Sequence, residues 1–152
     1  MPVISDVRAH VLRDSAIVRS AVFADAMKEP ASELKRMERE LNVWLPPDFE
    51  WFVTSLGSGA SGAFSGTRHA IANTLRFREA VSLPPQFLVL DDRNDAGVVL
   101  LDTASPAARV LWIDMHAAGK LANGTLAASE HDVFPTLEAW LIYCVQEAGD
   151  EP

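Results

Sequence analysis

The chain has 152 residues, of which 49% are apolar and 22% are charged, and its formal net charge is −8 at pH 7. This length and composition are typical of one globular domain that buries its own core without disulfides or metal. The single cysteine excludes an internal disulfide framework and a zinc site built from several cysteines. The acidic balance argues against direct binding of a nucleic-acid backbone, because phosphates attract Lys and Arg.

The negative charge is distributed unevenly. Residues 1–44 hold 7 basic and 7 acidic side chains, so the whole acidic excess lies in residues 45–152. This excess either only maintains solubility or forms a negative surface that attracts a basic partner. The N-terminus lacks the charged and apolar regions of a secretory signal, and no apolar run reaches the length of a membrane span. We therefore expect a cytoplasmic protein that does not bind membranes.

Residues 1–30 have the weakest pattern in the chain. Apolar residues at roughly helical spacing predict one or two helices, which end before Glu29-Pro30. We expect this segment to be an N-terminal helical extension that either packs on the domain or supports a homodimer.

Two helices joined by a sharp corner are predicted within residues 33–62. The first carries an apolar stripe with a helical period, formed by Leu34, Met37 and Leu41. Proline disfavours a helical conformation in the residue before it, so Pro46-Pro47 ends this helix and suits the start of the next. The second helix carries a matching stripe of Phe49, Phe52, Val53 and Leu56, and Gly57 ends it.

A third helix, an antiparallel meander and a closing helix are predicted downstream. The helix covers residues 68–81, and three apolar strands with short connections cover 86–90, 98–101 and 110–115. Because the strands are apolar almost throughout, we expect the sheet to be covered on much of both faces. Residues 117–132 are predicted to be a loop with a short strand near Leu126, and residues 134–147 form the closing helix.

The order of these motifs resembles that of the SUKH superfamily, the Smi/Knr-like domain. The first match covers the helical corner: Glu38, Leu41, Leu45, Pro46, Asp48, Phe49, Phe52, Leu56 and Gly57. Further matches are Leu83-Pro84, the strands between residues 87 and 112, and the closing helix at 134–147. The chain departs from the family where Asn-Gly-Gly is replaced by Leu56-Gly57-Ser58-Gly59. The resemblance covers residues 31–147 and leaves 148–152 as a polar tail.

This resemblance implies a single α+β domain, in which an antiparallel sheet packs against helices. It also implies a function. Bacterial domains similar to this one act largely as immunity proteins, which bind and neutralise a cognate toxin that is often a nuclease. The alternative is a regulatory scaffold module, as in the resembling fungal domains, with a partner that is not a toxin.

The residue patterns that usually mark catalysis or cofactor binding do not fit. The G-x-G-x-x-G at residues 57–62 follows a helix, whereas a dinucleotide site requires a preceding strand. The acidic turn from Asp92 fails the EF-hand spacing, and Cys144 lies on an apolar helical stripe, as a structural cysteine does. We expect neither an enzyme nor a cofactor or metal. An enzyme would need a concave site that brings together polar groups near Asp114, His116 and His131.

The candidate partner-binding residues are acidic or aromatic. They are Asp91, Asp92, Asp95, Asp114, Glu50 and Trp51. Trp51 points away from the apolar stripe of its helix, so it is either covered by another element or exposed as an interface anchor. We expect structural roles for the other tryptophans: Trp112 in a strand, Trp140 in the core stripe of the closing helix, and Trp44 beside the helical corner.

Overall fold

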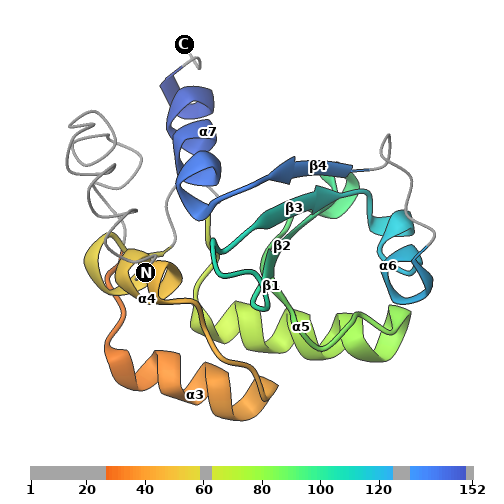
Figure 1. The fold of residues 1–152 in the computed structure, drawn as a ribbon, viewed down its shortest axis with the longest axis horizontal. Coiled ribbons are helices and arrows are strands. Elements are labelled where there is room, and N and C mark those ends of the chain that lie inside the picture. Colours follow the sequence, from red (N-terminus) through yellow and green to blue (C-terminus); the bar gives the residue numbers. More distant parts are fainter. Residues whose placement is uncertain (1–26, 59–62, 125–130, 150–152) are drawn as a thin grey trace.

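The computed structural model describes residues 27–58, 63–124 and 131–149, so most of the predicted N-terminal extension lies outside the described residues. Helices and strands are segregated along the chain, which confirms the predicted α+β class (Figure 1). The larger elements are α3 (Ala31–Leu41), α4 (Pro47–Ser55), α5 (Thr67–Val81), β1 (Phe87–Asp92), β2 (Val98–Asp102), β3 (Val110–Ile113), β4 (His131–Phe134) and α7 (Leu137–Gly149). The short helices are η2 (Asn94–Ala96), η3 (Met115–Ala117) and α6 (Lys120–Asn123).

The sheet is an antiparallel meander with the strand order β1-β2-β3-β4. Three of its strands were predicted from the sequence, whereas β4 was assigned partly to a loop and partly to the closing helix. In the structure, β4 pairs with β3 from His131 opposite Ile113 to Phe134 opposite Val110. The helix α7 therefore begins only at Leu137, after the two residues that follow the strand.

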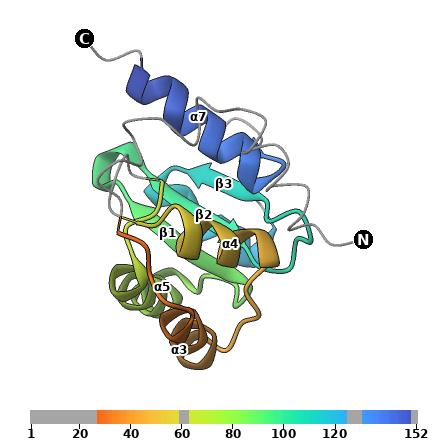
Figure 2. The same ribbon diagram turned by 90° about the vertical axis from the view of Figure 1, so that its left-hand side faces the viewer.

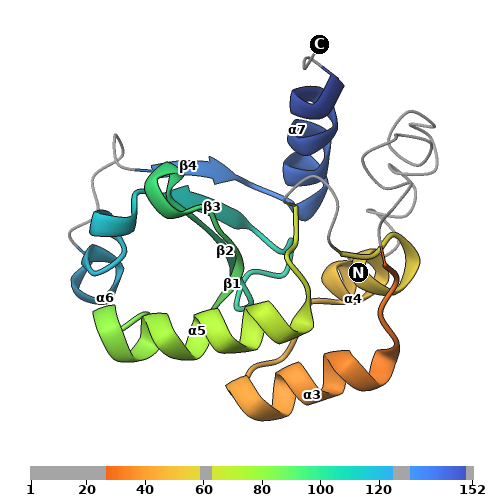
Figure 3. The ribbon, with the colours of Figure 1, turned by 180° about the vertical axis from the view of Figure 1, so that it is seen from behind.

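Both faces of the sheet are covered, as the apolar strands predict. Alternate residues of a strand point to opposite faces, and in β2 Val99 and Leu101 belong to one core cluster, whereas Val98 and Leu100 belong to the other. The larger cluster receives side chains from α3, α4, α5 and α7, and α4 lies across this face (Figure 2). The smaller cluster is closed by Phe77 of α5, with α6 near the end of α5 (Figure 3).

The outer edge of β1 is satisfied by hydrogen bonds from other elements. A bulge leaves Leu90 without a counterpart in β2, since Val89 pairs with Leu100 and Asp91 with Val99. The carbonyl of Leu90 accepts a backbone bond from Ser65 at 2.9 Å, and the Val89 N–H donates to Thr74 Oγ1 of α5 at 2.9 Å. These contacts prevent β1 from being an open edge to which another strand could add.

The corner between α3 and α4 is built by backbone capping. Asn42 adopts a left-handed conformation (φ 55°) after α3, and the Leu45 N–H donates to Glu38 Oε2 at 3.0 Å. Leu45 is thereby turned into the core, and Pro47 starts α4 as predicted. The expected structural role of Trp44 is wrong: its side chain is 85% exposed, because the same turn that buries Leu45 directs its neighbour outward.

Candidate functional site

The tight turn between β1 and β2 is fixed against the end of β3. The Arg93 N–H donates to the Gly97 carbonyl at 2.9 Å, and the Asn94 N–H donates to Asp92 Oδ1 at 3.0 Å. Gly97 has φ 99°, and a Cβ at this position would collide with the Ile113 carbonyl of β3. The close approach of the two backbones holds the exposed Asp95 at the tip of the turn.

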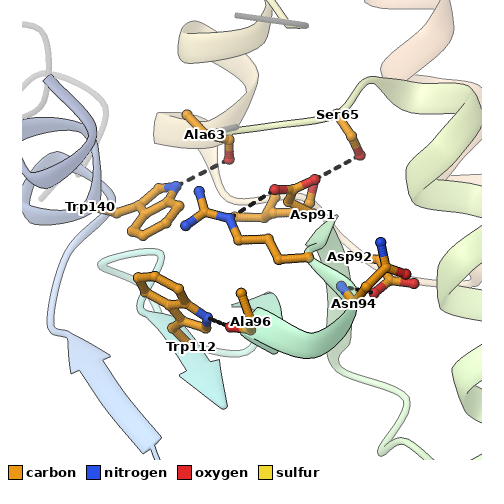
Figure 4. Close-up of polar contacts among 10 residues, drawn as sticks. Ala63, Ser65, Asp91, Asp92, Asn94, Ala96, Trp112 and Trp140 are labelled. Atoms are coloured by element: carbon orange, nitrogen blue, oxygen red, sulfur yellow. Dashed lines mark hydrogen bonds and ion pairs between the residues drawn. The ribbon is translucent and has the colours of Figure 1, made fainter. Parts of the chain in front are cut away.

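Two tryptophans and an arginine pack beside this turn, and Figure 4 shows Trp112 next to Ala96. Trp112 Nε1 donates to the Ala96 carbonyl at 2.7 Å. The Arg93 guanidinium lies 4.6 Å from the Trp112 ring centroid and 5.3 Å from that of Trp140, within the range of cation–π attraction. Its Nε also donates to Asp91 Oδ2 at 2.9 Å. Trp140 in turn donates from Nε1 to the Ala63 carbonyl at 3.1 Å, which connects α7 to the segment before α5.

Beside this turn lies an open hollow of about 290 Å³, here named the acidic hollow. Its lining residues are Asp95, Ala96, Trp112, Ile113, Asp114, His131 and Asp132. Three exposed carboxylates converge there from separate segments: Asp95 from η2, Asp114 after β3, and Asp132 from β4. Among the described residues, none of the three is in an ion pair. The hollow therefore presents a concentrated negative charge to the solvent.

The structure divides the predicted acidic residues into two groups. Asp95 and Asp114 line the acidic hollow, whereas Asp91 and Asp92 are the last residues of β1 and are engaged in ion pairs. The Asp91 side chain lies on the face of the sheet that α7 covers and forms an ion pair with Arg93. The Asp92 side chain lies on the opposite face and forms an ion pair with Arg76 of α5. The bulge at Leu90 accounts for this placement, since it sets which face each of the two carboxylates occupies.

Glu50 and Trp51 lie on α4 and do not line the acidic hollow. Trp51 is partly buried and packs against the larger core cluster, so it is neither fully covered nor fully exposed. Burial raises the pKa of Glu50, and the neighbouring carboxylate of Glu38 raises it further, while Lys35 opposes the shift. These two residues therefore belong to a different part of the surface from Asp95 and Asp114.

Two members of the acidic hollow, Trp112 and Asp132, were missed as site residues by sequence reasoning, and a third, His131, was considered only as part of an enzyme site. The segment from His131 to Phe134 was assigned to a loop and a helix, although the β-branched and aromatic pair Val133-Phe134 is a weak strand signal. Recognising β4 would have placed Asp132 opposite Trp112 and beside the end of β3. Trp112 was recognised as a strand residue, but its bond to the turn is a tertiary contact that no local pattern contains.

Cys144 is buried, as its place on an apolar stripe predicts. Burial raises the pKa of its thiol to about 12, although the nearby Arg93 guanidinium partly opposes the shift. A thiol with this pKa is protonated at neutral pH and is a poor nucleophile. Cys144 therefore serves as an apolar core side chain on α7.

The described part of the chain contains no cluster of three or more His, Cys, Asp or Glu side chains arranged to hold a metal ion. Nor does it contain a helix long and apolar enough to cross a membrane. Comparisons with models of known protein families and with curated proteins find no match for this chain. Chemically, the acidic hollow is suited to accept Lys and Arg side chains, since carboxylates form charge-assisted hydrogen bonds with both.

Proposed function

We propose that this chain is a non-enzymatic immunity protein of the SUKH type, which binds and neutralises a basic, nuclease-type toxin in the cytoplasm. Two lines support the proposal. The order of motifs resembles that superfamily, and the observed α+β architecture is the one that the resemblance implies. The second line is the chemistry of the acidic hollow.

The observation that carries the proposal is the convergence of Asp95, Asp114 and Asp132 around one hollow. A nuclease grips phosphate groups with Lys and Arg, so its active face carries positive charge. A negative surface of complementary shape speeds the encounter with such a face and fixes its orientation. The indole of Trp112 adds an apolar wall against which the stems of Lys or Arg side chains can pack.

The acidic hollow also contains His131 and Asp114, two of the three groups around which an enzyme site was considered, whereas His116 is exposed and does not line it. We favour binding over catalysis because the hollow is open and its three carboxylates are exposed to water, whereas catalytic groups act most strongly in a site that excludes water. A binding surface needs only the carboxylates and the aromatic wall, all of which are present.

The test is a pull-down from the source organism with the full chain as bait, at low and at high salt. The test variant is the triple substitution Asp95→Asn, Asp114→Asn, Asp132→Asn. The matched control removes the same number of negative charges outside the acidic hollow, one from each of α3, α5 and α7. Its substitutions are Glu40→Gln, Glu79→Gln and Glu147→Gln. A captured basic protein is then expressed in a heterologous bacterial host, with and without the chain.

The proposal predicts that the captured protein stops growth of the host and that co-expression of the chain restores growth. The Asn triple variant should lose both capture and rescue, and the Gln triple variant should retain both. If the only specific partner is a housekeeping protein that is harmless when expressed, the regulatory scaffold function replaces the immunity function. If the two triple variants behave alike, the acidic hollow is not the binding surface.

A further inference from the structure

The two edges of the sheet differ in what covers them. At β1, hydrogen bonds with Ser65 and Thr74 occupy the outer edge. Along the outer side of β4, the described chain has no helix and no further strand (Figures 1 and 3). Within the same residues, no hydrogen bond reaches Val133 from an element other than β3, and its side chain is 46% exposed. The strand β4 is therefore the open edge of the sheet, to which another strand can pair.

The backbone groups that point outward from this edge belong to Val133. In an antiparallel sheet, successive residues of a strand direct their N–H and C=O alternately to the two sides. The Asp102 N–H donates to the Arg109 carbonyl at 2.9 Å, so the backbone of Arg109 is directed to β2 and that of the next residue, Val110, to β4. Phe134 lies opposite Val110 and is therefore bonded to β3. The residue before it, Val133, directs its N–H and C=O away from the sheet.

The side chains beside this edge are acidic and aromatic on one face of the sheet and aliphatic on the other. Residues directly opposite each other in a ladder share a face, so Asp132 lies beside Trp112 in the acidic hollow. Phe134 is on the same face, and its ring centroid lies 5.2 Å from that of Tyr143. Val133 points to the opposite face. An added strand would thus meet a carboxylate and aromatic rings on one face and an aliphatic side chain on the other.

We propose that a basic partner docks on this protein by adding an extended strand to β4, with side chains that are alternately cationic and apolar. The strand exchanges backbone hydrogen bonds with Val133 and places an apolar side chain beside it. The side chain opposite Asp132 is Lys or Arg, because opposite charges directly across a ladder stabilise the pairing. The inference rests on the proposed function for the identity of the partner and states how that partner is bound.

Charge decides which strand the edge accepts. Edge strands avoid indiscriminate pairing by being short and by carrying charged side chains, and β4 has four residues, one of which is Asp132. Asp95 and Asp114 line the same hollow, so two copies paired through β4 would bring two sets of these three carboxylates together. A cationic strand instead neutralises this charge. The backbone bonds then hold the strand, whereas the exposed carboxylates select and orient it.

The probe is the synthetic peptide acetyl-Lys-Val-Lys-Val-Lys-amide, titrated into the isotope-labelled full chain and followed by NMR. We expect a Kd of about 1 mM, with shifts centred on β4 and slower hydrogen exchange of the Val133 amide. Two N-methylated isomers of the peptide form a matched pair with the same charge and composition. Methylation of both valines removes the N–H groups that face β4, whereas methylation of two lysines removes N–H groups on the far side. The valine isomer should bind at least about tenfold more weakly than the lysine isomer.

Substitution of Val133 tests the same hydrogen bond from the side of the protein. Val133→Pro removes the outward N–H and leaves the bonds between β3 and β4 in place, as proline does on an edge strand. It should weaken peptide binding at least about tenfold, whereas Val133→Ala keeps the N–H and should weaken it at most about threefold. Circular dichroism checks the fold of both variants. If Val133→Pro does not fold, the pair of methylated isomers still decides the result.

Equal binding of the two isomers, or tighter binding of the valine isomer, would overturn strand addition. So would a chain whose β4 edge is already paired with a second copy, which sedimentation equilibrium and protection of the Val133 amide without peptide would reveal. The two proposals fail in different ways. If a captured toxin binds Val133→Pro as tightly as the wild type, strand addition is wrong and the immunity function stands. If the peptide binds as expected but no toxin is captured, the strand site stands and the immunity function is wrong.

Discussion

At the scale of single residues, the most consequential side chain is Arg93. It is one charged group that joins three parts of the molecule: the turn of the acidic hollow, β1 through Asp91, and α7 through Trp140. Its side chain is 21% exposed and that of Asp91 is 19% exposed, so both charges are largely removed from water. An ion pair in this position stabilises the fold mainly because removal of either partner would leave the other charge partly buried and unpaired, which is unfavourable.

We expect Arg93→Met to lower the free energy of unfolding by about 2 kcal/mol, because it leaves the Asp91 carboxylate partly buried without its cation. Urea denaturation measures the change. Adding Asp91→Asn to this variant should recover part of the loss. The control is Arg76→Met, which removes the partner of Asp92 from a 57% exposed position and should cost less than about 1 kcal/mol. Equal losses for the two Arg variants would contradict this account.

Cys144 gives the molecule a defined response to alkaline pH. The thiol is protonated in the native state, where its pKa is raised to about 12, but ionises above its ordinary value of 9.0 in the unfolded chain. The unfolded state therefore binds fewer protons above this value, and stability falls as pH rises. The contribution of this thiol is complete below pH 9.0 and is lost progressively towards pH 12.

We expect this group alone to lower stability by about 1 kcal/mol between pH 9 and 10. Urea denaturation of the wild type and of Cys144→Val at both pH values isolates the effect, since the variant has the same other titrating groups. Thiol labelling adds a second readout: the native protein should react with iodoacetamide far more slowly than the urea-unfolded chain. A pH dependence that is the same in both proteins would show that the thiol does not ionise differently on unfolding.

At the scale of elements, the turn from Arg93 to Gly97 is the most constrained connection of the sheet. Gly97 combines φ 99° with ψ −166°, a conformation that only glycine adopts readily, and a Cβ added there would lie 2.4 Å from the Ile113 carbonyl oxygen. Two independent obstacles, backbone strain and collision, thus oppose any side chain at this position. The conformation of this turn also fixes the position of Asp95 in the acidic hollow.

Gly97→Ala should therefore lower the free energy of unfolding by at least about 2 kcal/mol. The matched control is Gly124→Ala, since Gly124 also has a positive φ of 70° but has open space around the added methyl group. There we expect a loss of about 1 kcal/mol, from backbone strain alone. Thermal and urea unfolding distinguish the two contributions, and a smaller effect at Gly97 than at Gly124 would mean that β3 can move away from the turn.

The elements that the sequence predicts well are those whose signals are local. The corner at Pro46-Pro47, the helix α5 and the meander β1–β3 follow from proline chemistry, helical spacing and apolar runs. The strand β4 was missed because its burial is slight, with Val133 46% exposed, so its period-2 pattern is weak. Its position depends on pairing with β3, which is a contact between distant residues.

The acidic hollow was predictable only in part for the same reason. Asp95 and Asp114 were found because acidic residues in turns are usually at the surface. A bulge determines which face of the sheet Asp91 and Asp92 occupy, and two arginines neutralise them in ion pairs. One of these arginines, Arg76, lies on a different element, α5. Trp44 shows the reverse case: a structural role beside the helical corner was predicted for it, but the geometry of the capped corner directs its side chain to the solvent.

At the scale of the whole molecule, the acidic hollow lies beside the turn before β2, whereas the exposed cations Lys35 and Arg39 lie on α3. Within the described part of the chain, the three carboxylates of the acidic hollow form no ion pair, so their charge is directed to the solvent. The chain's negative charge then acts mainly on the rate at which a basic partner arrives.

This arrangement of charge leads to a kinetic expectation for the proposed toxin complex. Because Asp95, Asp114 and Asp132 are exposed, they act through long-range attraction, and replacing all three by Asn should lower the association rate constant about tenfold at low salt. Surface plasmon resonance with the captured partner measures both rate constants across ionic strengths. The salt dependence of association should be shallower in the Asn variant than in the Glu40→Gln, Glu79→Gln, Glu147→Gln control, which has the same net charge. If the Asn variant instead associates normally and dissociates faster, the three carboxylates are buried in the complex and act as direct contacts.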